Sequence, residues 1–197
     1  SALVTFNPHP QEIIHSQQKF SHICTSVHQL RLLEEQGLDE VHIINFTSEL
    51  SQMLPEKFAL QFLIKRFKLV KLVIGYDFRF GKNREGDFKL LENLSQQFNF
   101  SLEEIHPVQQ KGRTVSSSLI RQLIREFRFA EIPQYLGREY SIYGMVEKGE
   151  QRGNKLGFPT ANIYPEVTLV LAPGVYVSKI KLAKKNYFGI TNAGYKP

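Results

Sequence analysis

The sequence predicts an α/β domain built on a doubly wound parallel sheet, followed by a smaller domain of β structure. Up to about residue 136, short apolar runs alternate with amphipathic helical segments, which is typical of a parallel sheet covered by helices. From about residue 140 the helical patterning stops and alternating β patterns replace it. We therefore expect two domains, residues 1–138 and residues 139–197.

Four apolar runs and three helical segments make up the predicted α/β domain. The runs are ALVTF (2–6), EVHIINF (40–46), LVKLVIG (69–75) and LEEIHPV (102–108). The third is rich in β-branched residues, as expected for a strand buried on both faces. The helical segments between them are 25–36, 55–67 and 88–98. The first opens with capping residues and the second with proline at a first-turn position.

The predicted β domain contains one strand at YSIYGMVEKG (140–149) and a hairpin at GVYVSKIKLAKKNYFGITNAG (174–194), with KKN as its tip. The chain opens directly onto a strand and stops inside a β pattern. We therefore expect it to be a fragment of a longer protein.

The composition excludes several classes of protein. With 42% hydrophobic and 22% charged residues, the chain is expected to be an ordinary folded, soluble protein and not a disordered one. No apolar run approaches the roughly 18 residues of a membrane span, and no signal peptide is visible. Cys24 is the only cysteine, which excludes an intrachain disulfide and a Cys/His metal cluster. These features predict a cytoplasmic protein.

The basic charge is concentrated near the C-terminus. Residues 140–197 carry 8 Lys and Arg against 3 Asp and Glu, which is most of the net charge of +6. Phosphates are the natural partners of such a surface. The alternative is a solvated, lysine-rich face.

Two segments follow predicted strands, where open α/β sheets bind ligands. The first is NPHP (7–10), in which prolines flank His9; the alternative is a turn with a hydrogen-bonded histidine. The second is GYDFRFGKNREGD (75–87). Gly75 permits close backbone approach. If the segment is extended, Phe78 and Phe80 share a face opposite Asp77, which suits a flat heteroaromatic ligand. The alternative is an aromatic plug in the core.

Three serines precede a helical apolar stripe in GRTVSSSLIRQLIREFR (112–128). Ser116, Ser117 and Ser118 therefore occupy a helix N-terminus, where amide groups and the helix dipole attract anions. Arg121, one turn further, presents a planar fork suited to the same phosphate. One serine is enough for an N-cap, so three serines with an arginine favour a phosphate site.

A glycine-rich basic loop precedes the sequence PTAN (159–162). Backbone amides of such a loop can wrap polyphosphate. The hydroxyl of Thr160 and the amide of Asn162 share a face if the chain is extended, and both are oxygen ligands suited to Mg²⁺. The alternative is a Gly/Pro corner of a small barrel. The loop glycines are Gly149, Gly153 and Gly157.

Taken together, six segments resemble, in order, the prokaryotic bifunctional riboflavin kinase/FMN adenylyltransferase family, also called FAD synthetase. They are TFNPHP, GYDFRFGKNREGD, VSSSLIR, GREYSIYGMVEKGEQRGNKLGFPTANI, PGVYV and ITNAGYKP. The resemblance runs over essentially the whole chain, and the order and spacing of the segments make it specific.

The resemblance implies a nucleotidyltransferase-like adenylyltransferase domain at 1–138 and an incomplete riboflavin kinase β-barrel at 139–197. It implies ATP, riboflavin, FMN and FAD as substrates and products, with Mg²⁺, and neither a nucleic-acid nor a membrane partner. It leaves the oligomeric state open.

The resemblance also implies roles for particular residues. SSSLIR (116–121) matches the family's Ser-Ser-Thr-x-x-Arg motif, which contacts ATP phosphates. GYDFRFG (75–81), with His9, matches the flavin and nucleotide cleft. PTAN matches the kinase signature, which places Thr160 and Asn162 near Mg²⁺ and the ATP phosphates, with the preceding glycines on the nucleotide.

The chain departs from the family pattern at several points. Ser118 stands for the usual threonine and keeps the hydroxyl, whereas Asn7 and Tyr76 replace acids. The family's His-x-Gly-His motif is absent and is expected before Ser1. The general base of the kinase is expected after Pro197. We therefore expect the catalytic residues of both reactions to lie outside these 197 residues.

Two other classes of function compete with this interpretation. One is a nucleic-acid-binding protein with a basic barrel, although the aromatic residues of the C-terminal part form no obvious stacking platform. The other is a monofunctional adenylyltransferase with a non-catalytic barrel, which the intact sequence GFPTAN disfavours.

Overall fold

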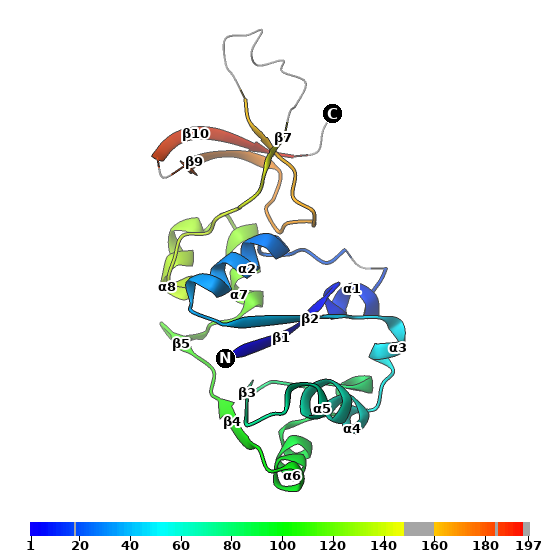
Figure 1. Cartoon of the computed structure of the whole chain (residues 1–197). Helices are drawn as coiled ribbons and strands as arrows, with labels where there is room; N and C mark the ends of the chain where they lie inside the picture. The colour runs from blue at the N-terminus through cyan, green and yellow to red at the C-terminus, as the bar shows by residue number, and fades with distance from the viewer. Residues whose placement is uncertain (18, 148–159, 184, 195–197) are drawn as a thin grey trace. The chain divides into compact units, whose positions relative to one another are not determined.

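The computed structural model describes residues 1–17, 19–147, 160–183 and 185–194 (Figure 1). The chain divides into two compact units. The first unit combines Ser1–Phe20 with Gly37–Thr114, and the second combines Ser21–Gln36 with Val115–Pro197. The domain boundary expected at residues 138 and 139 stays a prediction.

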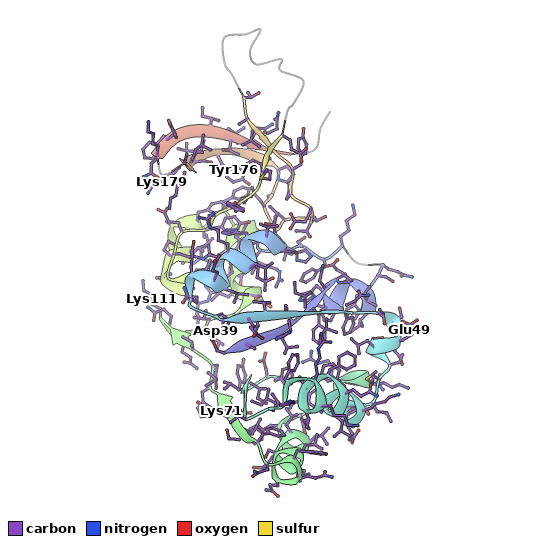
Figure 2. All side chains as sticks on the ribbon, viewed as in Figure 1. Asp39, Glu49, Lys71, Lys111, Tyr176 and Lys179 are labelled. Atoms are coloured by element: carbon purple, nitrogen blue, oxygen red, sulfur yellow. The ribbon has the colours of Figure 1, made fainter. Side chains whose placement is uncertain are left out.

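The first unit contains the four predicted strands. They are β1 (Ala2–Asn7), β2 (Glu40–Asn45), β3 (Lys71–Gly75) and β4 (Ser101–Ile105), with a short antiparallel pair, β5 (Gln109–Gln110) and β6 (Arg113–Thr114). β1 is parallel to β2 and β3 is parallel to β4. Lys71, which is labelled in Figure 2, forms an ion pair with Glu103 that supports the second pairing.

The expected single sheet is not formed by the described residues. Strands pair only where their backbones lie about 4.8 Å apart, and no ladder joins β1 and β2 to β3 and β4 in the described part of the chain. The parallel pairing was therefore predicted correctly, whereas the continuity of the sheet stays a prediction.

Helices connect these strands. They are α1 (Pro10–Ile14), α3 (Ser48–Ser51), α4 (Pro55–Phe58), η1 (Ala59–Ile64), α5 (Lys65–Phe67), η2 (Lys82–Arg84) and α6 (Phe88–Phe98). The helix predicted at 55–67 is continuous, but η1 is a π-helix. Its wider turn keeps Phe58 and Leu63, which are five residues apart, in the same core, where each is 5% exposed.

Aromatic rings fill the centre of the first unit's core. Phe58 contacts three rings, with centroid distances of 6.1 Å to Phe6, 5.4 Å to Phe62 and 5.8 Å to Phe80. Because Phe80 belongs to the loop after β3, this packing holds that loop against α4. A backbone hydrogen bond also holds the loop in this place, since the amide of Lys82 donates to the carbonyl of Met53 at 2.7 Å.

Gly81 is the position in this loop where a side chain is least tolerated. Its φ is +72°, and an added Cβ would lie 2.6 Å from the Cα of Pro55. Gly112 has the same φ but nothing within 4 Å. We expect Gly112→Ala to cost about 1–2 kcal/mol of unfolding free energy, and Gly81→Ala about 1–3 kcal/mol more because of the clash. Urea unfolding of both variants measures the difference, and equal costs would contradict this close contact.

The second unit begins with a helix from the N-terminal half of the chain. Its elements are α2 (Ser26–Glu35), α7 (Ser117–Arg125), η3 (Phe129–Glu131), α8 (Ile132–Leu136), β7 (Val146–Glu147), β8 (Asn162–Ile163), β9 (Gly174–Leu182) and β10 (Lys185–Ala193). The apolar stripe predicted on α7 is confirmed. It forms the core with α8 and Val170, and its buried members are Leu119, Ile120, Leu123 and Ile124.

The predicted hairpin is confirmed, but its tip is displaced. β9 and β10 are antiparallel, and Leu182 pairs with Lys185. Lys185 and Asn186, two residues of the predicted tip, are therefore strand residues, and the third, Lys184, lies outside the described residues.

The strand predicted at 140–149 was largely wrong. Within its described part, only Val146 and Glu147 form a strand, paired antiparallel with β8. The preceding residues bond to α2 instead, since the hydroxyl of Thr25 donates to the carbonyl of Tyr143 at 3.3 Å. This contact spans 118 residues and leaves no local pattern in the sequence.

The β structure of the second unit is open in its described part. β7 with β8 and β9 with β10 form two separate two-stranded sheets, and no barrel closes among the residues described. Across the described ranges, no helix has both the length and the apolar character that a bilayer span requires.

Candidate functional site

The three serines lie at the N-terminus of α7, as predicted. Ser116 is the N-cap, and its hydroxyl accepts from the amide of Leu119 at 3.2 Å. Ser117 and Ser118 occupy the exposed first turn. Capping therefore accounts for Ser116 and not for the other two hydroxyls, which border the positive end of the helix dipole.

Arg121 lies one turn into α7 and is half-buried. Its Nε donates to the carbonyl of Ser21 at 2.9 Å, which orients the guanidinium plane. Burial, and secondly Arg125, lowers the pKa of Arg121, but a guanidinium stays charged at physiological pH. The site thus contains a guanidinium that is oriented by a hydrogen bond. The residue that accepts this bond, Ser21, lies 100 residues earlier in the chain.

The loop after β3 turns the rings of Phe78 and Phe80 inward and the carboxylate of Asp77 outward. The amide of Phe78 donates to the carbonyl of Gly75 at 3.0 Å, which makes a tight turn. Phe78 stacks on Phe80 at 5.4 Å, and Phe80 is only 7% exposed. Asp77 is exposed. The alternative of a core plug therefore describes Phe80, while a ligand-binding role for this loop stays a prediction.

His9 lies just after the carboxyl end of β1. Gly75 is likewise the residue at the carboxyl end of β3. The Nδ1 of His9 accepts from the amide of Gln11 at 3.2 Å, so the imidazole caps α1. The ring stacks on Phe20 with centroids 4.2 Å apart. These contacts fix the imidazole, and the predicted role of His9 in the cleft is not tested by them.

The predicted adenylyltransferase residues therefore fall into two sets. His9 and the loop after β3 belong to the first unit, whereas the serines and Arg121 belong to the second unit. The three serines and Arg121 lie together at the start of one helix, α7, whereas the closeness of His9 to the loop after β3 stays a prediction.

The predicted kinase residues are only partly described. Gly149, Gly153 and Gly157 lie outside the described residues. Thr160 is exposed, and Asn162 is half-buried in β8, paired with Glu147. Among the residues the structure describes, no group of three His, Cys, Asp or Glu side chains is placed to hold a metal ion. The hydroxyl and amide oxygens of Thr160 and Asn162 are compatible with Mg²⁺, which takes few protein ligands.

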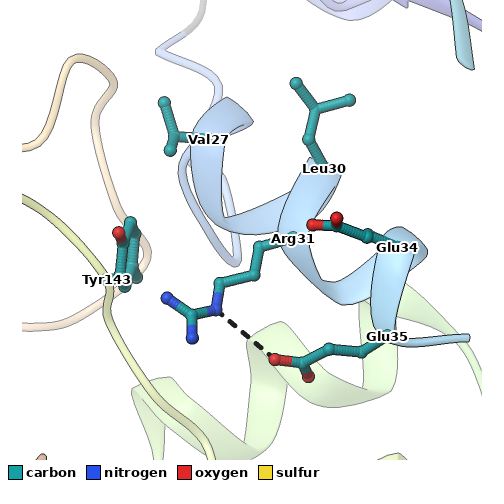
Figure 3. A pocket seen from close by; sticks show the side chains of 6 residues that line it. All are labelled: Val27, Leu30, Arg31, Glu34, Glu35 and Tyr143. Atoms are coloured by element: carbon teal, nitrogen blue, oxygen red, sulfur yellow. Dashed lines mark hydrogen bonds and ion pairs between the residues drawn. The ribbon is translucent and has the colours of Figure 1, made fainter.

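A hollow on the second unit was missed by sequence reasoning (Figure 3). It has a volume of about 530 Å³ and lies between α2 and Tyr143. The guanidinium of Arg31 lies 5.0 Å from the centroid of the Tyr143 ring, and its Nε is 3.4 Å from Oε1 of Glu35. Only the fold brings Tyr143 to this helix. The other lining residues are Val27, Leu30 and Glu34.

Comparison with known families agrees with the order of the motifs. A family model described as FAD synthetase matches residues 1–119, and one described as riboflavin kinase matches residues 136–197.

Curated relatives align with the chain over nearly its whole length. Bifunctional riboflavin kinase/FMN adenylyltransferase from Buchnera aphidicola subsp. Schizaphis graminum is 34% identical, covering 100% of this chain and 64% of the relative. The protein of that name from Escherichia coli K12 is 30% identical, covering 99% and 63%. A crystal structure described as a macrolide-efflux protein from Streptococcus pneumoniae has a TM-score of 0.76 at 27% identity, covering 98% of this chain and 63% of that one.

The chain thus spans less than two thirds of the length of the curated relatives it matches. The resemblance inferred from the six motifs is confirmed. The first family model alone covers residues 1–119 of the 197. The chain therefore belongs to the FAD synthetase family.

Proposed function

We propose that the protein containing this chain makes FAD from riboflavin in two ATP-dependent steps. Riboflavin is first phosphorylated to FMN, and FMN is then joined to the AMP part of ATP with release of pyrophosphate. The observation that carries this proposal is the succession of a FAD synthetase match and a riboflavin kinase match along one chain. We also propose that, in the whole protein, β1 to β4 belong to one doubly wound sheet and that β7 to β10 belong to a barrel.

In the adenylylation step, a phosphate oxygen of FMN attacks the α-phosphorus of ATP, and the bond to pyrophosphate breaks. Such reactions depend mainly on positioning and on neutralising phosphate charge. The N-terminus of α7 supplies amide groups and the hydroxyls of Ser117 and Ser118 for this purpose. Arg121, oriented by its bond to Ser21, supplies a fixed positive charge.

The loop after β3 is proposed to hold the flavin or the nucleotide. Asp77 is exposed and offers a carboxylate to donors on a ring edge. Phe78 is half-buried, and its stacking on the buried Phe80 gives it a rigid backing. His9, held as the cap of α1, is proposed to border the same cleft.

In the phosphorylation step, the hydroxyl oxygen of riboflavin attacks the γ-phosphorus of ATP, the bond to ADP breaks, and the hydroxyl proton is released. The side-chain oxygens of Thr160 and Asn162 are proposed to bind Mg²⁺. When bound, Mg²⁺ neutralises charge on the ATP phosphates. The basic balance of residues 140–197 supports binding of a polyphosphate in this part of the chain.

The test is to incubate the full-length protein with riboflavin, ATP and MgCl₂ and to separate the flavins by reverse-phase chromatography. We expect FMN to accumulate first and FAD to follow. FAD formed from added FMN but never from riboflavin would indicate an adenylyltransferase with a non-catalytic barrel. Failure to bind either flavin, with salt-dependent binding of DNA or RNA, would favour the nucleic-acid alternative.

A further inference from the structure

The N-terminus of α2 is hydrogen-bonded to two later segments of the second unit. The hydroxyl of Thr25 donates to the carbonyl of Tyr143 at 3.3 Å, and the amide of Ser26 donates to Oε1 of Glu166 at 2.8 Å. One residue of this helix, His28, is buried at the first of these junctions. It faces the segment 138–143, which lies within the residues 136–197 matched to riboflavin kinase.

His28 is buried with one of its two ring nitrogens lacking a hydrogen-bond partner among the described residues. The residue is 5% exposed, and Nδ1 has no hydrogen-bond partner among the described residues. Nε2 lies 3.5 Å from the hydroxyl oxygen of Ser141, at the outer limit of a hydrogen bond. The ring faces Tyr143 at 6.0 Å. An imidazolium needs an acceptor for each of its two N–H groups, and this site offers at most one.

The groups around the ring also oppose a positive charge. Arg138, whose Nη1 is 3.5 Å from the same Ser141 hydroxyl, and Arg31 both repel a charged imidazole, while Glu35 attracts it. Burial raises the pKa of the Cys24 thiol, and it raises the pKa of Tyr140 to about 12, so both stay neutral near pH 7. Burial first, and then Arg138, lowers the pKa of His28.

We propose that His28 forms a pH-sensitive contact between α2 and residues 138–143. Uptake of a proton by its imidazole releases these residues from α2. The neutral ring fits the junction, whereas the charged ring has one unpartnered N–H and faces Arg138. Release lets the ring reach water.

The direction of the pH dependence follows from linkage. The folded pKa of His28 lies below its unfolded value of about 6.5. Its contribution is therefore fully present above that unfolded value and is lost as the pH falls towards the folded pKa. One proton raises the equilibrium constant for opening by at most about tenfold per pH unit within this window.

The first test is amide hydrogen exchange of the full-length protein between pH 7.5 and pH 5, with rates corrected for the intrinsic pH dependence of exchange. We expect protection of residues 139–143 and of the first turn of α2 to fall by up to about tenfold per pH unit below about pH 6.5. In His28→Gln this fall should be absent. A matched control, His15→Gln, removes an exposed imidazole and should keep the fall.

The second test uses the unaltered protein. In an NMR titration of its histidine rings, with the ring of His28 assigned through neighbouring residues, we expect that ring to show a depressed pKa. If the ring of His28 titrates at the ordinary value, the proposal is wrong. The same acid-induced opening in His28→Gln would also overturn it.

Discussion

Replacing Thr160 by alanine is expected to remove riboflavin phosphorylation while leaving FMN adenylylation intact. Thr160 lies just before β8, away from α7 in the sequence and exposed to solvent. Its hydroxyl is proposed to bind the metal that accompanies ATP in the kinase reaction only. Loss of one group that stabilises transition-state charge lowers the rate on the order of 10²–10³-fold. Initial rates of FMN formation from riboflavin, and of FAD formation from FMN, measure the two reactions separately in one preparation.

Two controls sharpen this experiment. Thr160→Ser keeps the hydroxyl and should keep most of the kinase activity. Thr168→Ala removes another exposed hydroxyl of the same unit, while its main-chain carbonyl still accepts from His22 at 2.8 Å. This second variant should match the unaltered protein in both reactions. Equal loss of both activities in Thr160→Ala would contradict the assignment of two separate sites.

Arg121→Ala is expected to have the opposite effect. The fork of its guanidinium is proposed to hold an ATP phosphate at the N-terminus of α7. We therefore expect FAD formation from FMN to fall on the order of 10²-fold or more, with riboflavin phosphorylation spared. Arg121→Lys keeps the charge but not the planar fork, so it should recover only part of the activity. Both reactions are measured with saturating ATP and with limiting ATP.

Because Arg121 also bonds to the carbonyl of Ser21, its removal can loosen the second unit. Arg125→Ala is the matched control, since Arg125 lies one turn further along α7 and is exposed. Thermal unfolding of the three proteins separates the two effects. If Arg121→Ala reduces the kinase rate as much as the adenylylation rate, its role is structural and the phosphate assignment is wrong.

Local patterns were enough to predict most of the elements. The apolar runs at β1 to β4 and the amphipathic stripes at α6 and α7 stand out because strand and helix periodicities are short-ranged. The π turn within 55–67 was not predictable in this way, since it depends on Phe58 and Leu63 sharing one core. The strand expected at 140–149 was wrong because Tyr143 bonds to α2 and not to a neighbouring strand.

In the candidate sites, too, features set by local patterns were predictable and features set by long-range contacts were not. The placement of Ser116 to Ser118 at a helix N-terminus follows from the stripe behind them, and the structure agrees. The anchor of Arg121 on Ser21 and the hollow beside Tyr143 join residues 100 or more positions apart. No periodicity in one sequence reveals such contacts. The sequence of the loop after β3 does not decide whether Phe80 is buried or faces a ligand, because its burial depends on core residues far away in the chain.

The second unit is built from two separate stretches of chain. This limits where the protein can be cut into pieces that keep their core contacts. Val170 packs in the core formed by α7 and α8, and Tyr176 stacks on Phe127 with centroids 6.2 Å apart. A C-terminal piece beginning at residue 139 would lose these partners together with α2. Exchange of the part matched to riboflavin kinase between proteins, by recombination or by engineering, therefore has to carry α7 and α8, and has to find a substitute for residues 21–36.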